Sequence, residues 1–188
     1  MNKERRDRLG DAAIDVLAQS GSRGLTHRAV DAAAAVPLGT TKNYFPTRDA
    51  LLRASTERII ELYKAIPRTA PADRPGLASL LRTLLEHARG PGRSRVLALL
   101  ELQREATRTL WLAAPLDAFA AGDFAYFEHA QRSAGLPVTP QRAATVTLAL
   151  HAALPHLVAE GPATQAAAGL DDLDSFVNSL LDTVYGAT

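Results

Sequence analysis

Two consecutive segments of the chain, residues 27–34 and 37–44, each have room for only about two turns of helix. Pro37 separates them, because the residue before a proline avoids the helical region whereas proline itself suits the first position of a new helix. Helices this short are unstable alone in water, so neighbouring helices must hold both of them. A longer helix followed by two short ones indicates a helix-turn-helix unit. The same spacing also fits a tight helical hairpin in any bundle.

The segments on either side of this pair are predicted to be helical as well. Residues 4–19 place apolar side chains on one face and charged side chains on the other, and the pattern ends at Ser20-Gly21. We expect Thr26 to cap the helix at 27–34 and Thr47 to cap a longer helix that runs to about Lys64. This longer helix must begin after Pro46, where the second short segment has to stop.

The remainder of the chain is predicted to form five further helices, separated by stretches rich in Gly and Pro. We place them at 76–88, 94–108, 111–134, 140–160 and 171–185. Pro155 cannot donate to the carbonyl of His151, so a kink or an exposed acceptor is expected there. Ala and Leu are abundant, and no β-branched or aromatic run of strand length occurs. The sequence therefore predicts an all-α protein.

Composition and missing motifs exclude several classes of protein. The 188 residues include no cysteine, which excludes disulfides, thiolate metal sites and cysteine nucleophiles. The five histidines lack the i,i+4 spacing of helical metal ligands, and no catalytic or nucleotide-binding motif is found. We therefore expect no metal, no cofactor and no enzymatic activity. No signal peptide or apolar stretch of membrane-spanning length is present, which predicts a cytoplasmic protein without membrane contact.

The segment between residues 24 and 52 contains a distinctive series of residues. The segment opens with Gly24-Leu25-Thr26-His27-Arg28-Ala29-Val30, continues through Gly39-Thr40, and ends with Phe45-Pro46-Thr47-Arg48-Asp49-Ala50-Leu51-Leu52. Over roughly residues 5–55 this pattern resembles the N-terminal domain of the TetR family of transcriptional regulators. The resemblance implies a three-helix, helix-turn-helix DNA-binding domain at 1–47. It also implies an antiparallel helical domain at 48–188 that binds an effector and dimerises.

Three positions depart from the family pattern. Ala35 stands where many members have glycine in the turn; a left-handed alanine costs about 1 to 2 kcal/mol, so either the strain is tolerated or the turn is adjusted. Lys42 replaces a tyrosine that usually contacts the DNA backbone. Leu38 replaces a commonly polar residue. These departures affect the details of DNA contact and leave the expected fold unchanged.

The outward side of residues 37–44 is the expected DNA-reading surface, because Val36, Thr41 and Phe45 supply the inward side. Asn43 can pair with adenine, Thr40 can touch a thymine methyl group, and Arg28 is the candidate for guanine. Leu38 offers apolar contact, and Gly39 lets the backbone approach closely. The expected phosphate contacts are Thr26, His27, Lys42, Tyr44 and Arg48, a partition that follows the family's usual one. Each side chain could instead be merely solvated, and Arg28 could pair with Asp31.

Specific DNA binding needs two such units on a near-palindromic operator, which predicts a homodimer. Apolar stripes on the last two long helices are the expected dimer interface, although they could instead close the protomer's own core. They consist of Val146, Leu150, Leu154, Leu157, Leu173, Phe176, Val177, Leu180, Leu181 and Val184.

A small-molecule effector is implied by the same resemblance, with the helix from Arg48 to Lys64 as the expected lever between the two domains. The candidate pocket residues are Tyr63, His87, Glu101, Trp111, Phe119, Tyr126, Phe127 and His151. Each of them could equally be a core or surface residue.

The combined prediction is a TetR-like transcriptional regulator, a repressor by analogy. It would bind a palindromic operator in double-stranded DNA as a homodimer and be released by a small-molecule effector. A helical module that binds a partner without DNA is the alternative, and an enzyme ranks behind it.

Overall fold

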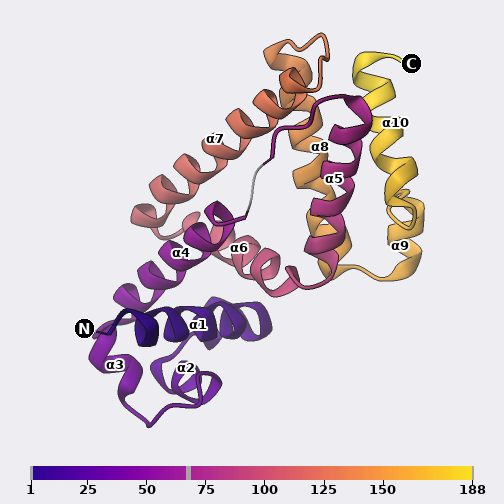
Figure 1. Ribbon diagram of the computed structural model, residues 1–188. Coiled ribbons are helices and arrows are strands. Elements are labelled where there is room, and N and C mark those ends of the chain that lie inside the picture. The colour runs from indigo at the N-terminus through magenta and orange to yellow at the C-terminus, as the bar shows by residue number, and fades with distance from the viewer. Residues whose placement is uncertain (1, 67–68, 188) are drawn as a thin grey trace. The chain divides into compact units, whose positions relative to one another are not determined.

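A computed structural model describes residues 2–66 and 69–187, and in this part of the chain ten helices and no strand are present (Figure 1). The prediction of an all-α protein is confirmed. The chain divides into two compact units. Unit 1 comprises residues 1–67 and 94–118, and unit 2 comprises residues 68–93 and 119–188. The predicted boundary after residue 47 separates a DNA-binding domain from an effector domain, whereas the two units are defined by packing. The predicted boundary stays a prediction.

Unit 1 contains α1 (Lys3–Gly24), α2 (His27–Ala33), α3 (Thr40–Tyr44), α4 (Arg48–Lys64), most of α6 (Arg93–Ala106) and the start of α7 (Leu110–Ser133). Leu9 and Leu17 of α1 are fully buried beside Leu51 and Leu52 of α4 in a single hydrophobic core. Residues of the later helices belong to this same core, namely Ala98, Leu102, Leu112 and Leu116. The helices that carry the helix-turn-helix therefore share one packed interior with α6 and the first turns of α7.

Unit 2 contains α5 (Arg74–Arg89), the remainder of α7, α8 (Pro140–Ala159), α9 (Pro162–Ala167) and α10 (Leu173–Tyr185). In Figure 1, α5 runs beside α8 and α10, and the three helices pack on one another. One buried polar residue, Gln131, links α7 to its neighbours. Its amide nitrogen donates to the carbonyl of Phe127 at 2.9 Å, and its Oε1 accepts the hydroxyl of Tyr185 at 2.8 Å.

Most predicted helices are present, with three differences. Gly21 interrupts α1 with φ 64° and ψ −175°, but helical turns resume and α1 continues to Gly24. The second short helix begins at Thr40 rather than Pro37, because Gly39 has φ 90°. The helix α9 was not predicted, although Gly161-Pro162 is a typical start signal. The predicted caps are confirmed, since Thr26 accepts from Ala29 N at 3.1 Å and Thr47 from Ala50 N at 3.0 Å.

Pro155 lies inside α8, which continues past it to Ala159. Within residues 2–66 and 69–187, no helix is both long and apolar enough to cross a membrane.

Candidate nucleic-acid interface

The buried carboxylate of Asp31 fixes the start of α3 to α2. Asp31 is only 1% exposed, and its two oxygens accept three hydrogen bonds from the following turn. The backbone N–H groups of Gly39 and Thr41 each donate at 2.7 Å, and the Thr41 hydroxyl donates at 2.5 Å. These bonds satisfy donors that a five-residue helix cannot satisfy internally. The start of α3 is thus held by one charged side chain from α2.

The same hydrogen bonds determine the ionisation of this carboxyl group. Burial by itself raises the pKa of Asp31, but the bonds from Thr41 and Gly39 and the proximity of His27 outweigh that effect. The pKa of Asp31 therefore lies below its ordinary value, and the group is ionised at neutral pH. The expected alternative, a surface ion pair between Arg28 and Asp31, is not formed, because Asp31 points into the turn.

The turn between α2 and α3 contains a strained alanine. Ala35 has φ 50°, and it is the one non-glycine residue with positive φ in the described part of the chain. Of the two outcomes expected for this position, the strain is tolerated and the turn is not adjusted. The backbone N–H of Val36 donates to the carbonyl of Asp31 at 3.0 Å and closes the turn. Asp31 thus supports the turn through its backbone as well as its side chain.

The end of α3 is held by His27. Its Nε2 lies 2.6 Å from the carbonyl oxygen of Phe45, and because a carbonyl only accepts, Nε2 carries the hydrogen. The Phe45 ring is buried, and the guanidinium of Arg6 lies over it at 5.1 Å from the ring centroid. The short helix α3 is therefore fixed at both ends by side chains of α1 and α2.

The remaining side chains of α3 form the outward face of the unit. Lys42 and Asn43 are exposed, and Leu38 just before the helix is 74% exposed. Thr40 is half-buried and donates its hydroxyl to the carbonyl of Pro37 at 2.6 Å, and Tyr44 packs partly on the core. Nothing lies within 4 Å of the position a Cβ would take on Gly39. This face presents a cation, an amide and apolar surface on a rigidly held helix.

Three of the expected phosphate contacts have other partners in the fold. The His27 ring is hydrogen-bonded to Phe45, as described above. Arg48 donates from Nη2 to the carbonyl of Ser22 at 2.7 Å, so its guanidinium serves the junction after α1. Thr26 uses its hydroxyl to cap α2. In contrast, Arg28 on α2 is exposed in the same way as Lys42 and Asn43.

Comparison with known proteins identifies the architecture. No protein-family model matches the chain, and no curated protein matches it. Solved structures do match: a member of the TetR family from Streptomyces coelicolor A3 is 28% identical, with a TM-score of 0.69 over 98% of this chain and 99% of that one. This chain therefore has the fold of TetR-family transcriptional regulators. A TetR-family structure from Rhodococcus sp. is 24% identical and shares the fold, with a TM-score of 0.70 over 98% and 100% of the two chains.

A third match is the multidrug-binding protein EbrR. In its complex with imidazole it is 27% identical, with a TM-score of 0.66 over 100% of this chain and 98% of EbrR. EbrR has also been solved with ethidium, and that structure is 28% identical with a TM-score of 0.66. The predicted resemblance to TetR-family regulators, a family without enzymatic activity, is confirmed by these matches.

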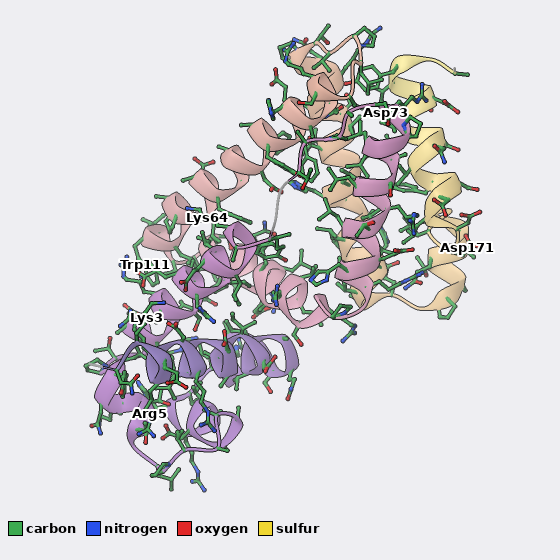
Figure 2. The ribbon with its side chains drawn as sticks, viewed as in Figure 1. Lys3, Arg5, Lys64, Asp73, Trp111 and Asp171 are labelled. Atoms are coloured by element: carbon green, nitrogen blue, oxygen red, sulfur yellow. The ribbon has the colours of Figure 1, made fainter. Side chains whose placement is uncertain are left out.

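The expected effector residues fall in different units. Tyr63 and Trp111 pack on the core of unit 1, and Trp111, beside α4 in Figure 2, lies under the guanidinium of Arg53 at 4.3 Å. Glu101, also in unit 1, accepts a hydrogen bond from the backbone of Ser22 instead of facing an open site. Unit 2 contains the other five, which are His87, Phe119, Tyr126, Phe127 and His151.

Two residues of unit 2 extend this set. The Nε2 of His151 lies 3.1 Å from a carboxylate oxygen of Asp123, and the Phe124 ring meets the His151 ring edge-on at 5.5 Å between centroids. Sequence reasoning missed Asp123, because the pairing joins residues of α7 and α8 that are 28 positions apart. The Phe127 ring is buried against Tyr126 at 5.2 Å. The Nε2 of His87 is buried and has no hydrogen-bond partner in the described structure.

The expected dimer stripe is largely used inside the protomer. Six of its ten side chains are at most 5% exposed in unit 2, and these are Val146, Leu150, Leu157, Leu173, Val177 and Leu181. Their burial within the protomer favours the alternative, in which the stripe closes the protomer's own core. The assignment of these residues to a dimer interface stays a prediction. Four members remain half-buried, namely Leu154, Phe176, Leu180 and Val184.

Proposed function

We propose that this chain binds operator DNA as a homodimer through α2 and α3, acts as a repressor in the cytoplasm, and is released by a small molecule. The observation that carries the proposal is the rigid mounting of α3. Asp31 and His27 fix its two ends, while Lys42 and Asn43 remain exposed on its outer face. A helix presented in this way suits the major groove, where side chains at its exposed face reach base edges.

The division between base and phosphate contacts can be tested with one operator obtained by selection from a random duplex pool. Asn43→Ala should weaken binding to the selected operator by about 5- to 150-fold and remove the preference for one base at a single base-pair position. The preference at the other positions of the operator should not change. Lys42→Ala should weaken binding to all duplexes and reduce the slope of log K against log salt by about one. A uniform loss for Asn43→Ala would contradict base reading, and failure of the wild type to select any duplex would contradict DNA binding.

An aromatic cation is the class of effector that we infer. EbrR has been solved with ethidium, proflavin and malachite green, all of which are aromatic cations. In unit 2 of this chain, the carboxylate of Asp123 lies 3.1 Å from the His151 ring, and the Phe124 ring meets that same ring edge-on. A carboxylate beside a pair of packed rings suits such a ligand, because charge and stacking act together.

Ethidium fluorescence provides a direct assay of this effector class. Asp123→Asn should weaken ethidium binding about tenfold, which corresponds to about 1.4 kcal/mol. Asp117→Asn is the matched control, because Asp117 is an exposed carboxylate on the same helix. Equal binding by the two variants would contradict a role for Asp123.

Dimerisation is expected to use the outer face of α8 and the half-buried side of α10. Leu148 on α8 is 58% exposed, and Phe176 and Leu180 of α10 retain accessible apolar area. Leu148→Glu should convert the dimer to a monomer in sedimentation, since a charge in an apolar interface is costly. Leu110→Glu is the control, because Leu110 is 86% exposed on α7 in unit 1. A Leu148→Glu protein that still dimerises would contradict this placement.

A further inference from the structure

A break in α1 places one residue in contact with α6. Gly21 leaves the helical region, and the following residue, Ser22, is only 5% exposed. The backbone N–H of Ser22 donates to Glu101 Oε1 at 2.7 Å, and its hydroxyl donates to Glu105 Oε2 at 2.5 Å. A Cβ on Gly21 would lie 3.0 Å from Glu101 Oε1, and φ 64° is a conformation that glycine adopts most readily. Two carboxylates of α6 therefore accept hydrogen bonds from the junction between α1 and α2.

Further polar groups complete this junction. Arg48 of α4 donates to the carbonyl of Ser22 at 2.7 Å, so all three polar groups of Ser22 are bonded to α4 or α6. Glu105 also accepts from the Thr109 hydroxyl at 3.2 Å. The hydrogen bond from Ser22 outweighs the effect of burial, and with Thr109 and the nearby arginines it lowers the pKa of Glu105. Glu105 is thus a charged acceptor at neutral pH, and hydrogen bonds to charged groups are stronger than neutral ones.

The spacing in the sequence predicts that Glu101 pairs with Arg104 and Glu105 with Arg108. One such pair exists, since Arg104 Nη2 lies 2.5 Å from Glu101 Oε2. The pairing leaves Glu101 Oε1 and Glu105 Oε2 directed at a residue about 80 positions earlier in the chain. The apolar core that contains residues of α1 and α6 packs without directional preference, whereas these hydrogen bonds specify one orientation of the chain that enters α2.

We propose that Glu101 and Glu105 are positioning residues that lock the entry to the helix-turn-helix onto α6, so that α2 and α3 follow α6 when it moves. This inference rests on the proposed function, in which an effector shifts the DNA-reading units. In the absence of the lock, Gly21 becomes a pivot, and α2 and α3 sample orientations that fit DNA poorly. The lock thus converts a displacement of α6 into a displacement of the DNA-reading helix.

The test measures orientation directly and needs no ligand. Because the chain has no cysteine, Ala33→Cys on α2 and Gln103→Cys on α6, both exposed, can carry a pair of spin labels. Pulsed electron resonance then gives the distribution of distances between them. Glu101→Ala with Glu105→Ala should at least double the width of this distribution. Glu101→Gln with Glu105→Gln should restore the wild-type width, because the amide oxygen still accepts from Ser22. Glu86→Ala is the control, because Glu86 pairs with Arg82 on its own helix.

A purely structural role predicts a different result. In that case the double alanine variant would lose thermal stability while its distance distribution kept the wild-type width, and this outcome would overturn the proposal. If the double variant does not fold, Ser22→Ala removes only the bond to Glu105. Its distribution should broaden less than twofold but measurably, and an unchanged width would likewise overturn the lock.

Operator binding separates failure of the lock from failure of the proposed function. The double alanine variant should bind the selected duplex about fivefold more weakly, because orientational freedom must be lost on binding. The double glutamine variant should bind like the wild type. If the wild type binds no duplex, the proposed function fails, whereas the spin-label distances still decide whether the lock exists.

Discussion

Replacing Asp31 with alanine should destabilise unit 1 more than any change on its exposed surface. The substitution removes three hydrogen bonds of 2.5 to 2.7 Å to a charged and buried acceptor. A hydrogen bond to a charged group contributes about 1.5 to 3 kcal/mol, but water can rebind part of what is released. We therefore expect a loss of about 3 to 5 kcal/mol in the free energy of unfolding, which is a large share of the stability of a typical domain.

Tryptophan fluorescence is a suitable assay, because Trp111 is the single tryptophan of the chain and packs on the core of unit 1. Urea unfolding monitored in this way reports unit 1. Asp31→Asn should lose about 2 to 3 kcal/mol, since the amide oxygen can keep the two bonds from Thr41 but the NH2 group then faces the Gly39 N–H, which is itself a donor. Asp15→Ala is the control, because Asp15 is exposed on α1 and should change stability by no more than about 0.5 kcal/mol.

The same residue predicts a pH dependence of definite sign. Since the pKa of Asp31 is lowered in the folded state, its contribution is fully present above the unfolded value of about 3.9. It is lost as the pH falls from there through the folded pKa. The wild type should therefore lose stability in this acidic range more steeply than Asp31→Asn does. Equal stability of Asp31→Ala and Asp15→Ala at pH 7 would refute the reasoning.

Three further substitutions test the turn, the end of α3 and the core of unit 2. Ala35→Gly should raise the stability of unit 1 by about 1 kcal/mol in urea unfolding, because the left-handed φ no longer strains a Cβ, and a decrease would contradict this account. His27→Ala should cost about 1 to 2 kcal/mol in the same assay and weaken all duplexes alike, whereas a change in base preference would favour direct reading by His27. Tyr185→Phe should lower the midpoint of thermal unfolding, measured by calorimetry, by about 3 °C, since Gln131 Oε1 loses its donor. An unchanged midpoint would contradict this.

The fold could be predicted largely from local signals, and the site only in part. Pro37, Thr26 and Thr47 mark helix boundaries through their own backbone chemistry, which needs no knowledge of distant residues. The role of Asp31 could not be found in this way, because its oxygens serve donors eight and ten positions later and a pairing with Arg28 fits the spacing equally well. The outward position of Lys42 and Asn43 followed from the inward pattern of their neighbours and agrees with their exposure.

Long-range pairings explain the other differences. Glu101 was expected at an effector pocket, but the amide that it accepts from lies on a helix 79 positions earlier, and no helical period reveals such a partner. The apolar stripes of α8 and α10 indicated burial correctly. They did not specify whether a second chain or the same chain covers them, because burial inside a protomer and burial in a dimer interface require the same kind of apolar side chain.

Unit 1 is assembled from two separate stretches of chain, and this has a consequence for synthesis on the ribosome. The nascent helix-turn-helix emerges first, but its core also needs Ala98, Leu102, Leu112 and Leu116. Until those residues have left the exit tunnel, the apolar sides of α1 and α4 face water or a chaperone. A polypeptide truncated after residue 66 would keep that apolar surface exposed. The DNA-reading part of this protein is therefore not expected to fold stably as an isolated fragment.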